Sequence, residues 1–250
     1  MKKLFLCLVL FVLLLSCKKQ ESKNITVFAS SSLRRALKEI CHNYESDTGV
    51  AIECIFNSSG KLREQIEAGT YPDIYFSSSR REINTLKNEE LLYNDTITNI
   101  LGNKIVLIAP KNSDIKIKSF ADLTNKSIKK IAIGESMTSP IGRYAEELLK
   151  HLGMYKYIAD KIILGNDAKH IIELVKMDKI DCGLVYETEA KLNDDSVTIV
   201  AKDLDYSKII YSLAIIEKSQ KEEESKKFID YLFSDKSMNI FKEYGFDINI

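Results

Sequence analysis

The stretch "ITVFASSSLRRALKEI", residues 25–40, sets a pattern that recurs along the chain. Its β-branched and aromatic run predicts a strand from Ile25 to Ala29, and the apolar residues from Leu33 onward recur at the spacing of one helix face. Between the two stand three serines, Ser30–Ser32. A single small hydroxyl is enough to cap a helix. The other serines therefore raise the question of what else these hydroxyls do.

Short apolar runs alternate with amphipathic segments along the rest of the chain, which predicts an α/β fold built on mostly parallel sheets. One strand–helix block ends near Gly102 and a second occupies residues 130–186, so we expect two lobes. A late apolar strand, "IIYSLAIIE", and the closing helices then return to the first lobe. Helices are predicted over Leu33–Tyr44, Leu62–Ala68, Ser79–Asn88, Gly142–Leu152, Lys169–Met177 and, as a final helical region, Lys221–Tyr244. We assign residues 25–103 and 204–250 to lobe 1 and residues 104–203 to lobe 2.

The first residues have the features of an export signal. A basic start, Met1–Lys3, precedes the apolar run "LFLCLVLFVLLLS", which is too short for a comfortable transmembrane span. The run ends in "LLSC", which resembles the bacterial lipobox, whose cysteine is acylated after cleavage. We therefore expect residues 1–16 to be a signal peptide, Cys17 to carry lipid, and residues 17–24 to form a tether that anchors an extracytoplasmic protein to a bacterial membrane.

Composition excludes several classes of function. The formal net charge is +0 for the 250 residues, and removing residues 1–16 leaves −2, so nothing indicates a nucleic-acid partner. The scattered histidines and the lack of a CxxC pair argue against a zinc site. Cys41 and Cys54, on a predicted helix and the following strand, could form a disulfide or stay as free thiols.

Four junctions between a strand and a helix carry the candidate chemistry. After Ser30–Ser32 come Ser58-Ser59-Gly60, then a loop ending at Pro140, then Asp167 as an N-cap. Helix N-termini leave backbone N–H groups unpaired and carry partial positive charge, and serines add hydroxyl donors. In parallel sheets such junctions gather at the carboxyl ends of the strands, where ligands bind. Capping explains each junction alone. Several such helix starts facing one cleft would bind an anion without any Lys or Arg, but their spacing leaves the ligand open.

Enzyme motifs are missing from the sequence. It has no GxSxG nucleophile elbow, no P-loop and no GxGxxG after a strand. A serine-dependent α/β hydrolase would need a histidine beside one of the junction serines, and only His170 lies near a junction. Asp73, before a predicted strand, is either a turn or cap residue or a functional one, and Tyr186 either belongs to a core or offers its O–H to a cleft.

At these residues the chain resembles the substrate-binding proteins of molybdate ABC importers, which have a two-lobed type II periplasmic-binding-protein fold. The resemblance runs from Ile25 to Ile250. It is carried by "ITVFASSSL", "FNSSGKLREQIEAG", "PDIYFSS", "LGNKIVLIAPKNS", "GESMTSPIGRYAEELLKHLG", "DCGLVYETEA" and "FIDYLFSDKSMNIFKEYGF". It implies a monomeric receptor, without cofactor or enzymatic activity, that delivers its solute to an importer permease.

The resemblance also implies the site, in which neutral donors hold the oxyanion without any direct ligand to the metal. Carried over by motif, Ser32 and Ser59 would donate from lobe 1. From lobe 2, Ile141 and Ala168 would give backbone N–H groups and Tyr186 its hydroxyl. The family pattern usually has a small residue where Ile141 stands and a third serine where Gly60 stands. Closure would occur about a hinge near Lys104–Pro110 and Val200–Lys208.

Molybdate and tungstate suit such a site because they are dianions without a proton near neutral pH, whereas a selective phosphate site needs a carboxylate acceptor. The sequence does not separate molybdate from tungstate. Sulfate, phosphate or an organic anion in the same fold remains an alternative, as does, more remotely, the hydrolase. An iron-binding relative would need a tyrosine cluster, and the sequence places only Tyr186 near the site.

Overall fold

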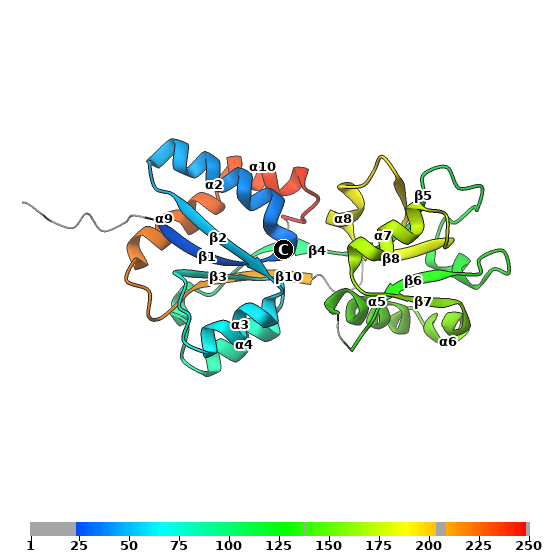
Figure 1. Ribbon diagram of the computed structural model, residues 1–250, viewed down its shortest axis with the longest axis horizontal. Helices are drawn as coiled ribbons and strands as arrows, with labels where there is room; N and C mark the ends of the chain where they lie inside the picture. Colours follow the sequence, from blue (N-terminus) through cyan, green and yellow to red (C-terminus); the bar gives the residue numbers. More distant parts are fainter. Residues whose placement is uncertain (1–23, 138, 204–208, 249–250) are drawn as a thin grey trace, which may run out of the picture.

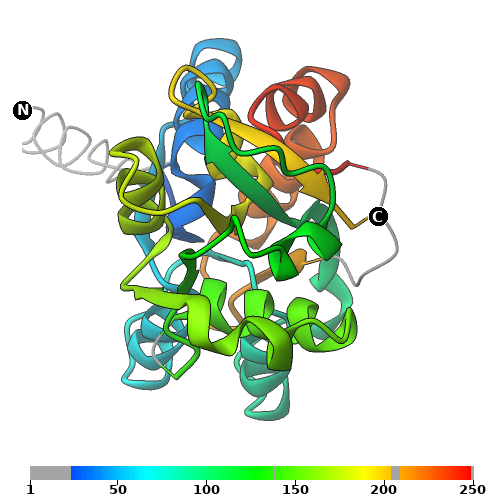
Figure 2. The same ribbon diagram turned by 90° about the vertical axis from the view of Figure 1, so that its right-hand side faces the viewer.

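The computed structural model describes residues 24–137, 139–203 and 209–248, which form two lobes side by side (Figure 1). Each lobe contains one sheet with helices on both faces, and Figure 2, drawn along the long axis, shows the second lobe in front of the first. The predicted signal peptide, the predicted lipid on Cys17 and the predicted tether up to residue 23 fall outside the described residues. Residues 204–208, which belong to the expected second hinge segment, also fall outside them.

The sheet of the first lobe has five strands in the order β2-β1-β3-β10-β4. Strand β1 pairs in parallel with β2 and β3, whereas β10 is antiparallel to β3 and β4. Four strands therefore run in one direction and β10 runs in the other. Their bounds are β1 Ile25–Ser30, β2 Ile52–Asn57, β3 Ile74–Ser77, β4 Thr98–Asn103 and β10 Ile209–Ile215.

Alternation along these strands decides which helices cover each face. Val27 and Phe76 face one side and pack against α2, α9 and α10, whereas Phe28 and Tyr75 face the other side and pack against α3 and α4. All four side chains are almost completely buried. The helices are α2 Arg34–Thr48, α3 Ser59–Glu67, α4 Arg80–Asn88, α9 Glu222–Leu232 and α10 Asp235–Glu243.

The second lobe repeats this plan with the strand order β7-β6-β8-β5-β9. Strands β6, β7 and β8 are parallel, and β5 is antiparallel to both β8 and β9. Helices α7 and α8 cover one face, over Val106 and Ile108, and α5 and α6 cover the other, over Leu107. The bounds are β5 Ile105–Pro110, β6 Ile131–Gly134, β7 Ile162–Gly165, β8 Cys182–Tyr186, β9 Val197–Lys202, α5 Pro140–His151, α6 Tyr155–Ile158, α7 Ala168–Lys176 and α8 Glu187–Lys191.

Close backbone packing seats α5 on β6. A Cβ atom added to Gly134 would lie 2.6 Å from the backbone N of Gly142, and one added to Gly142 would lie 2.5 Å from the carbonyl of Gly134. Because such distances are not tolerated between a Cβ and backbone, both positions require glycine. The start of α5, which carries Ile141, is thereby held against the carboxyl end of the strand.

The predicted fold class is confirmed, with each sheet mostly parallel and the chain passing between the lobes twice. The sequence reading did not include β4, α6 or α8, and the expected helical region Lys221–Tyr244 consists of two helices separated at Phe233 and Ser234. Short 3-10 turns add η1 Ser31–Leu33, η2 Asn94–Thr96, η3 Phe120–Thr124 and η4 Ala159–Lys161.

The first hinge segment is shorter than the sequence suggested. Strand β4 ends at Asn103 and β5 begins at Ile105, so the first passage between the lobes consists of Lys104. Lys104 lies at the start of the expected hinge segment Lys104–Pro110, and the rest of that segment, Ile105–Pro110, is a buried strand paired on both sides. Strand β9 likewise extends to Lys202, so Val200 belongs to the second sheet.

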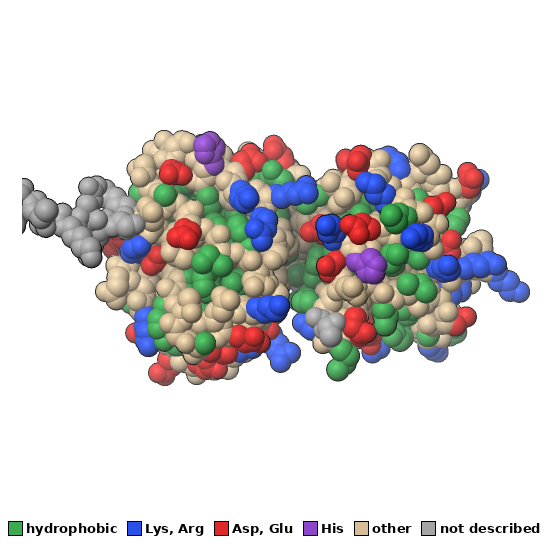
Figure 3. Space-filling model, viewed as in Figure 1, with side chains coloured by type: hydrophobic (Ala, Val, Ile, Leu, Met, Phe, Trp, Pro, Cys, Tyr) green, Lys and Arg blue, Asp and Glu red, His purple; other side chains and the backbone are tan. Residues whose placement is uncertain are grey.

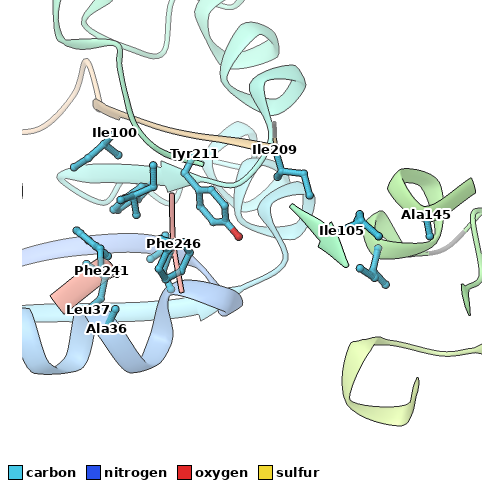
Figure 4. Packing of buried hydrophobic residues seen from close by; sticks show 14 of the residues in the cluster. Ala36, Leu37, Ile100, Ile105, Ala145, Ile209, Tyr211, Phe241 and Phe246 are labelled. Carbon is cyan, nitrogen blue, oxygen red and sulfur yellow. The ribbon is translucent and has the colours of Figure 1, made fainter. Parts of the chain in front are cut away.

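Buried hydrophobic residues continue from one lobe to the other beside this passage. Figure 4 shows Tyr211 and Ile209 of the first lobe near Ile105 of the second, in one cluster that extends from Phe241 to Ala145. The lobes are therefore in apolar contact at the hinge and separate only away from it.

Cys41 of α2 and Cys54 of β2 are free thiols whose Sγ atoms lie 3.5 Å apart. The sulfur–sulfur contact with Cys54, together with burial, raises the pKa of the Cys41 thiol far above its usual value. Among the described residues, no helix has both the length and the apolar composition needed to cross a bilayer.

Candidate functional site

A cavity of about 450 Å³ lies between the lobes, at the groove visible in Figure 3. It is formed where strands end and helices begin, as the junctions predicted. Eight serines line it: Ser30, Ser31, Ser32, Ser58, Ser59, Ser78, Ser79 and Ser139. The five residues singled out from the sequence all line it too, namely Ser32, Ser59, Ile141, Ala168 and Tyr186. The structure thus brings together residues that lie up to 154 positions apart in the chain.

The three serines that open the folded chain do not cap α2 with their hydroxyls. Ser30 precedes the short turn η1 and makes no side-chain capping bond; α2 itself starts at Arg34. By contrast, Ser58 caps α3 by accepting from the N–H of Lys61 at 3.4 Å. The hydroxyls at the first junction are therefore available for other contacts.

Ser30 and Ser59 form a buried pair. Their Oγ atoms lie 2.6 Å apart, with exposed fractions of only 2% and 7%. The backbone N–H of Ser78 donates to both, at 2.8 Å to Ser30 Oγ and 3.1 Å to Ser59 Oγ. Ser30 Oγ also lies 3.4 Å from the carbonyl oxygen of Phe76, to which it donates, and Ser59 Oγ lies 3.2 Å from Ser78 Oγ. Ser30 is not among the site residues predicted from the sequence.

On the other side of the junction, Ser32 is half-buried, and its Oγ lies 3.0 Å from the hydroxyl of Tyr211 in β10. Tyr211 is buried against Phe246, with ring centroids 5.3 Å apart. Neither β10 nor Tyr211 entered the sequence reading of the site.

Two helix N-termini of the second lobe reach the cavity. Pro140 and Ile141 are the first residues of α5, and Ala168 is the first residue of α7. Asp167 caps α7 as expected, accepting the N–H of His170 at 2.8 Å. N–H groups in the first turn of a helix have no partner within the helix and lie at its positive end. Both starts thus offer backbone donors to the cavity.

Tyrosines complete the second-lobe wall. Burial raises the pKa of Tyr186 well above its usual value, with nearby Tyr211 and Tyr144 adding to the effect. Burial likewise raises the pKa of Tyr144, which also lines the cavity. Both phenols are therefore neutral donors at physiological pH. The expectation that Tyr186 is the only tyrosine near the site was wrong, because Tyr144 on α5 reaches it one helical turn after Pro140.

Charged side chains stand around this neutral set. Lys61 and Arg143 line the cavity together with four acids: Glu64, Glu82, Asp167 and Glu189. Glu82 is paired with Arg63 at 2.6 Å, and Asp167 is used in capping. Burial raises the pKa of Glu189, Arg35 opposes the shift, and Asp167 adds to it. A bound anion would thus rely on local dipoles more than on net positive charge.

Among the described residues, the cavity lining shows neither a serine–histidine pair nor a cluster of metal ligands. No histidine is among the described residues that line the cavity, and His170 instead accepts from the N–H of Asn166 at 3.3 Å. In the part of the chain that the structure describes, no three His, Cys, Asp or Glu side chains are grouped so as to hold a metal ion.

Comparison with known proteins agrees with this geometry. The family model for bacterial extracellular solute-binding proteins matches residues 25–247. The chain is 35% identical to YvgL of Bacillus subtilis, provisionally named an ABC transporter substrate-binding lipoprotein, over 94% of both chains. It is 31% identical to the molybdate-binding protein ModA of Escherichia coli, over 90% of this chain and 89% of that one.

A solved structure, described provisionally as the substrate binding domain of a molybdenum ABC transporter from Clostridium difficile, superposes with a TM-score of 0.83. It is 31% identical and covers 90% of this chain and 98% of its own. The chain therefore belongs to the bacterial extracellular solute-binding protein family, whose members here are transport receptors rather than enzymes. The resemblance found in the sequence is confirmed.

Proposed function

We propose that this chain binds molybdate or tungstate in the cavity between its lobes. The observation that supports it most is the set of neutral donors from both lobes: the hydroxyls of Ser32, Ser59 and Tyr186 and the backbone N–H groups of Ile141 and Ala168. A tetrahedral dianion without a proton needs donors on all sides and no acceptor. Relatives named as molybdate-binding proteins support the same assignment.

Neutral donors also favour release of the anion to a permease. A buried ion pair would carry large desolvation terms in both directions, whereas hydrogen bonds from hydroxyls and helix N-termini can be exchanged for water. In this proposal the lobes close about Lys104 and bring Ser32 and Ser59 toward the second-lobe donors. The closed receptor then docks on an ABC importer permease.

A phosphate-bearing anion is the second candidate, and Glu189 is the observation that favours it. Its carboxyl group lines the cavity and could accept the proton that phosphate retains near neutral pH.

Calorimetric titration of the mature, anion-free chain with molybdate, tungstate, sulfate and phosphate separates these candidates. We expect the first two to bind more tightly than sulfate or phosphate. Ser32→Ala and Ser59→Ala should each lower affinity by about 10- to 100-fold, since a hydrogen bond to a charged group contributes about 1.5–3 kcal/mol. Ser225→Ala, at a buried hydroxyl in α9, should leave affinity unchanged. Tighter phosphate binding would favour the second candidate, and no binding would refute both.

We further propose that lipid on Cys17 holds the receptor at the outer face of a bacterial membrane. Its support is the "LLSC" sequence and the lipoprotein name of the Bacillus subtilis relative. Cys17→Ala should release the protein from the membrane fraction and abolish incorporation of a labelled fatty acid. Retention of both properties in the variant would contradict the anchor.

A further inference from the structure

Asn103, the last residue of β4, has an orientation that its neighbours determine. It is 1% exposed, and its Oδ1 accepts the backbone N–H of Lys104 at 2.9 Å. Because a backbone N–H only donates, the side-chain oxygen must face Lys104 and the amide N–H₂ must point the other way. That group donates to Thr188 Oγ1 at 3.1 Å and to the Tyr211 hydroxyl oxygen at 3.3 Å.

The Tyr211 proton then has a single acceptor among its described neighbours. Asn103 Nδ2 cannot accept, so the phenolic O–H donates to Ser32 Oγ, 3.0 Å away. A buried hydroxyl left without an acceptor would be costly, which favours this direction. Figure 4 shows the Tyr211 hydroxyl pointing away from the Phe241 end of the cluster.

The direction of the bond from Tyr211 in turn decides what Ser32 can offer. With Tyr211 donating to its oxygen, Ser32 retains its own proton for another partner, and Ser32 lines the cavity. If Tyr211 instead accepted from Ser32, the serine would present only lone pairs to the cavity and would repel an anion.

We propose that Asn103 is a positioning residue that makes Ser32 a hydrogen-bond donor to the anion, acting through Tyr211. This inference rests on the proposed anion-binding function and extends it to residues that do not line the cavity. Such chains of hydrogen bonds also polarise one another, so the Ser32 hydroxyl is a stronger donor at the end of the relay than alone.

The same side chain connects the relay to the second lobe. Thr188 belongs to α8, is 1% exposed, and accepts from Asn103 next to Lys104, where the chain passes between the lobes. Since Asn103 lies beside the hinge, a rotation about Lys104 moves Thr188 little relative to it. The relay can therefore stay intact while the lobes open and close.

The decisive variant is Asn103→Asp, which keeps an acceptor for Lys104 but replaces the amide donor with a carboxylate oxygen. Tyr211 then donates to the aspartate, Ser32 donates to Tyr211, and the direction of the relay reverses. Molybdate affinity, measured by calorimetry, should fall by about 10- to 100-fold, as for loss of the Ser32 hydrogen bond. Adding Ser32→Ala to Asn103→Asp should then lower molybdate affinity little further.

Two controls separate the relay from a charge effect. Asn99→Asp adds the same charge to the exposed part of β4, where Asn99 Oδ1 accepts from Ser212 at 2.7 Å, and should change affinity by less than about twofold. In a Tyr211→Phe background, Asn103→Asp should lose most of its effect, because the connection to Ser32 is gone. An equal effect of Asn103→Asp with and without the Tyr211 hydroxyl would overturn the relay.

If circular dichroism and thermal melting show that Asn103→Asp does not fold, a double-mutant cycle of Tyr211→Phe and Ser32→Ala provides the test. Tyr211→Phe is nearly isosteric, and Ser32→Ala should cost at least threefold less affinity in that background than in the wild type. Additive effects in this cycle would refute the relay while the wild type still binds molybdate. If the wild type binds none of the four oxyanions, the proposed function fails and the relay fails with it.

Discussion

At the residue scale, the hydrogen-bond donors that the cavity presents depend on the acceptors available to individual hydroxyl groups. Ser30 illustrates this, since it is too deeply buried to meet a ligand freely yet touches Ser59, which is placed to do so. The backbone N–H of Ser78 restricts both oxygens to accepting from one side. Side chains behind the cavity wall therefore control what the wall presents.

Ser30→Ala should lower oxyanion affinity by about 3- to 10-fold, because Ser59 loses the buried hydroxyl that helps to hold its side chain at the cavity. The free energy of unfolding should fall by about 1 kcal/mol, the net value of one buried hydrogen bond. Calorimetry and urea denaturation measure the two effects.

Ser225→Ala is the matched comparison for stability. Ser225 Oγ is buried in α9 and has no hydrogen-bond partner among the described residues. Removing an unsatisfied buried hydroxyl should leave stability unchanged or raise it by about 1 kcal/mol. A Ser30→Ala protein with wild-type affinity would show that Ser59 does not need this neighbour.

Tyr211 predicts a pH dependence of stability in the alkaline range. Burial raises the pKa of Tyr211 to about 12, with hydrogen bonds to Ser32 and Asn103 opposing the shift. The unfolded chain ionises near pH 10, so the stabilising contribution is complete below about pH 10 and is lost as pH rises toward 12. Between these two pH limits, the contribution of Tyr211 to the free energy of unfolding should change by about 2–3 kcal/mol.

Urea unfolding of the wild type and of Tyr211→Phe between pH 8 and about pH 11.5 measures this contribution. The comparison with Tyr211→Phe is needed because other tyrosines also titrate in this range. The difference between the two proteins should shrink as pH rises through this range. A constant difference would mean that Tyr211 ionises normally in the folded state.

At the element scale, the positions of helix starts matter more than helix length. The contact between Gly134 and Gly142 presses the first turn of α5 onto the end of β6. Ile141, whose N–H is one of the proposed donors, lies directly before this contact. Displacing the helix start would therefore move a donor as well as strain the lobe.

Gly142→Ala should destabilise the protein by about 1–3 kcal/mol, since the added methyl group would overlap backbone atoms of Gly134 and Glu135. Oxyanion affinity should fall as well. In Gly60→Ala, where the nearest atom to an added Cβ is Glu82 Oε2 at 4.0 Å, stability should be unchanged or slightly higher. Thermal melting and calorimetry on both variants test this, and equal stability of the two would contradict the packing argument.

Elements that carry a local signal were predictable from the sequence. The serine-rich junctions and the Asp167 cap each lie where an apolar run meets a helical pattern, so residues within a few positions identified them. Strand β4 was missed because "TNILGN" has short polar flanks and gains its strand character from β10, more than 100 residues later. Asn103 and Tyr211 were missed for the same reason, since only the folded sheet brings them together.

At the scale of the whole molecule, two short passages join lobes that also share apolar contacts. The residues beside the first passage, Asn103, Ile105 and Tyr211, are buried and in well-packed surroundings. In the proposed function, motion of one lobe relative to the other would therefore be concentrated at Lys104. Closure would change the cavity, at the groove, far more than it changes the packing at the hinge.

The charges around the cavity have a consequence for the kinetics of capture. Four acids and two bases line a site that is proposed to receive a dianion, and residues 17–250 carry a formal charge of −2. Such a field slows the approach of anions, and dissolved ions screen it over about 10 Å at 0.1 M. Stopped-flow association should therefore accelerate between 10 and 200 mM sodium chloride, and less so in Glu189→Gln. A receptor of this kind would collect its anion faster in brackish surroundings than in fresh water.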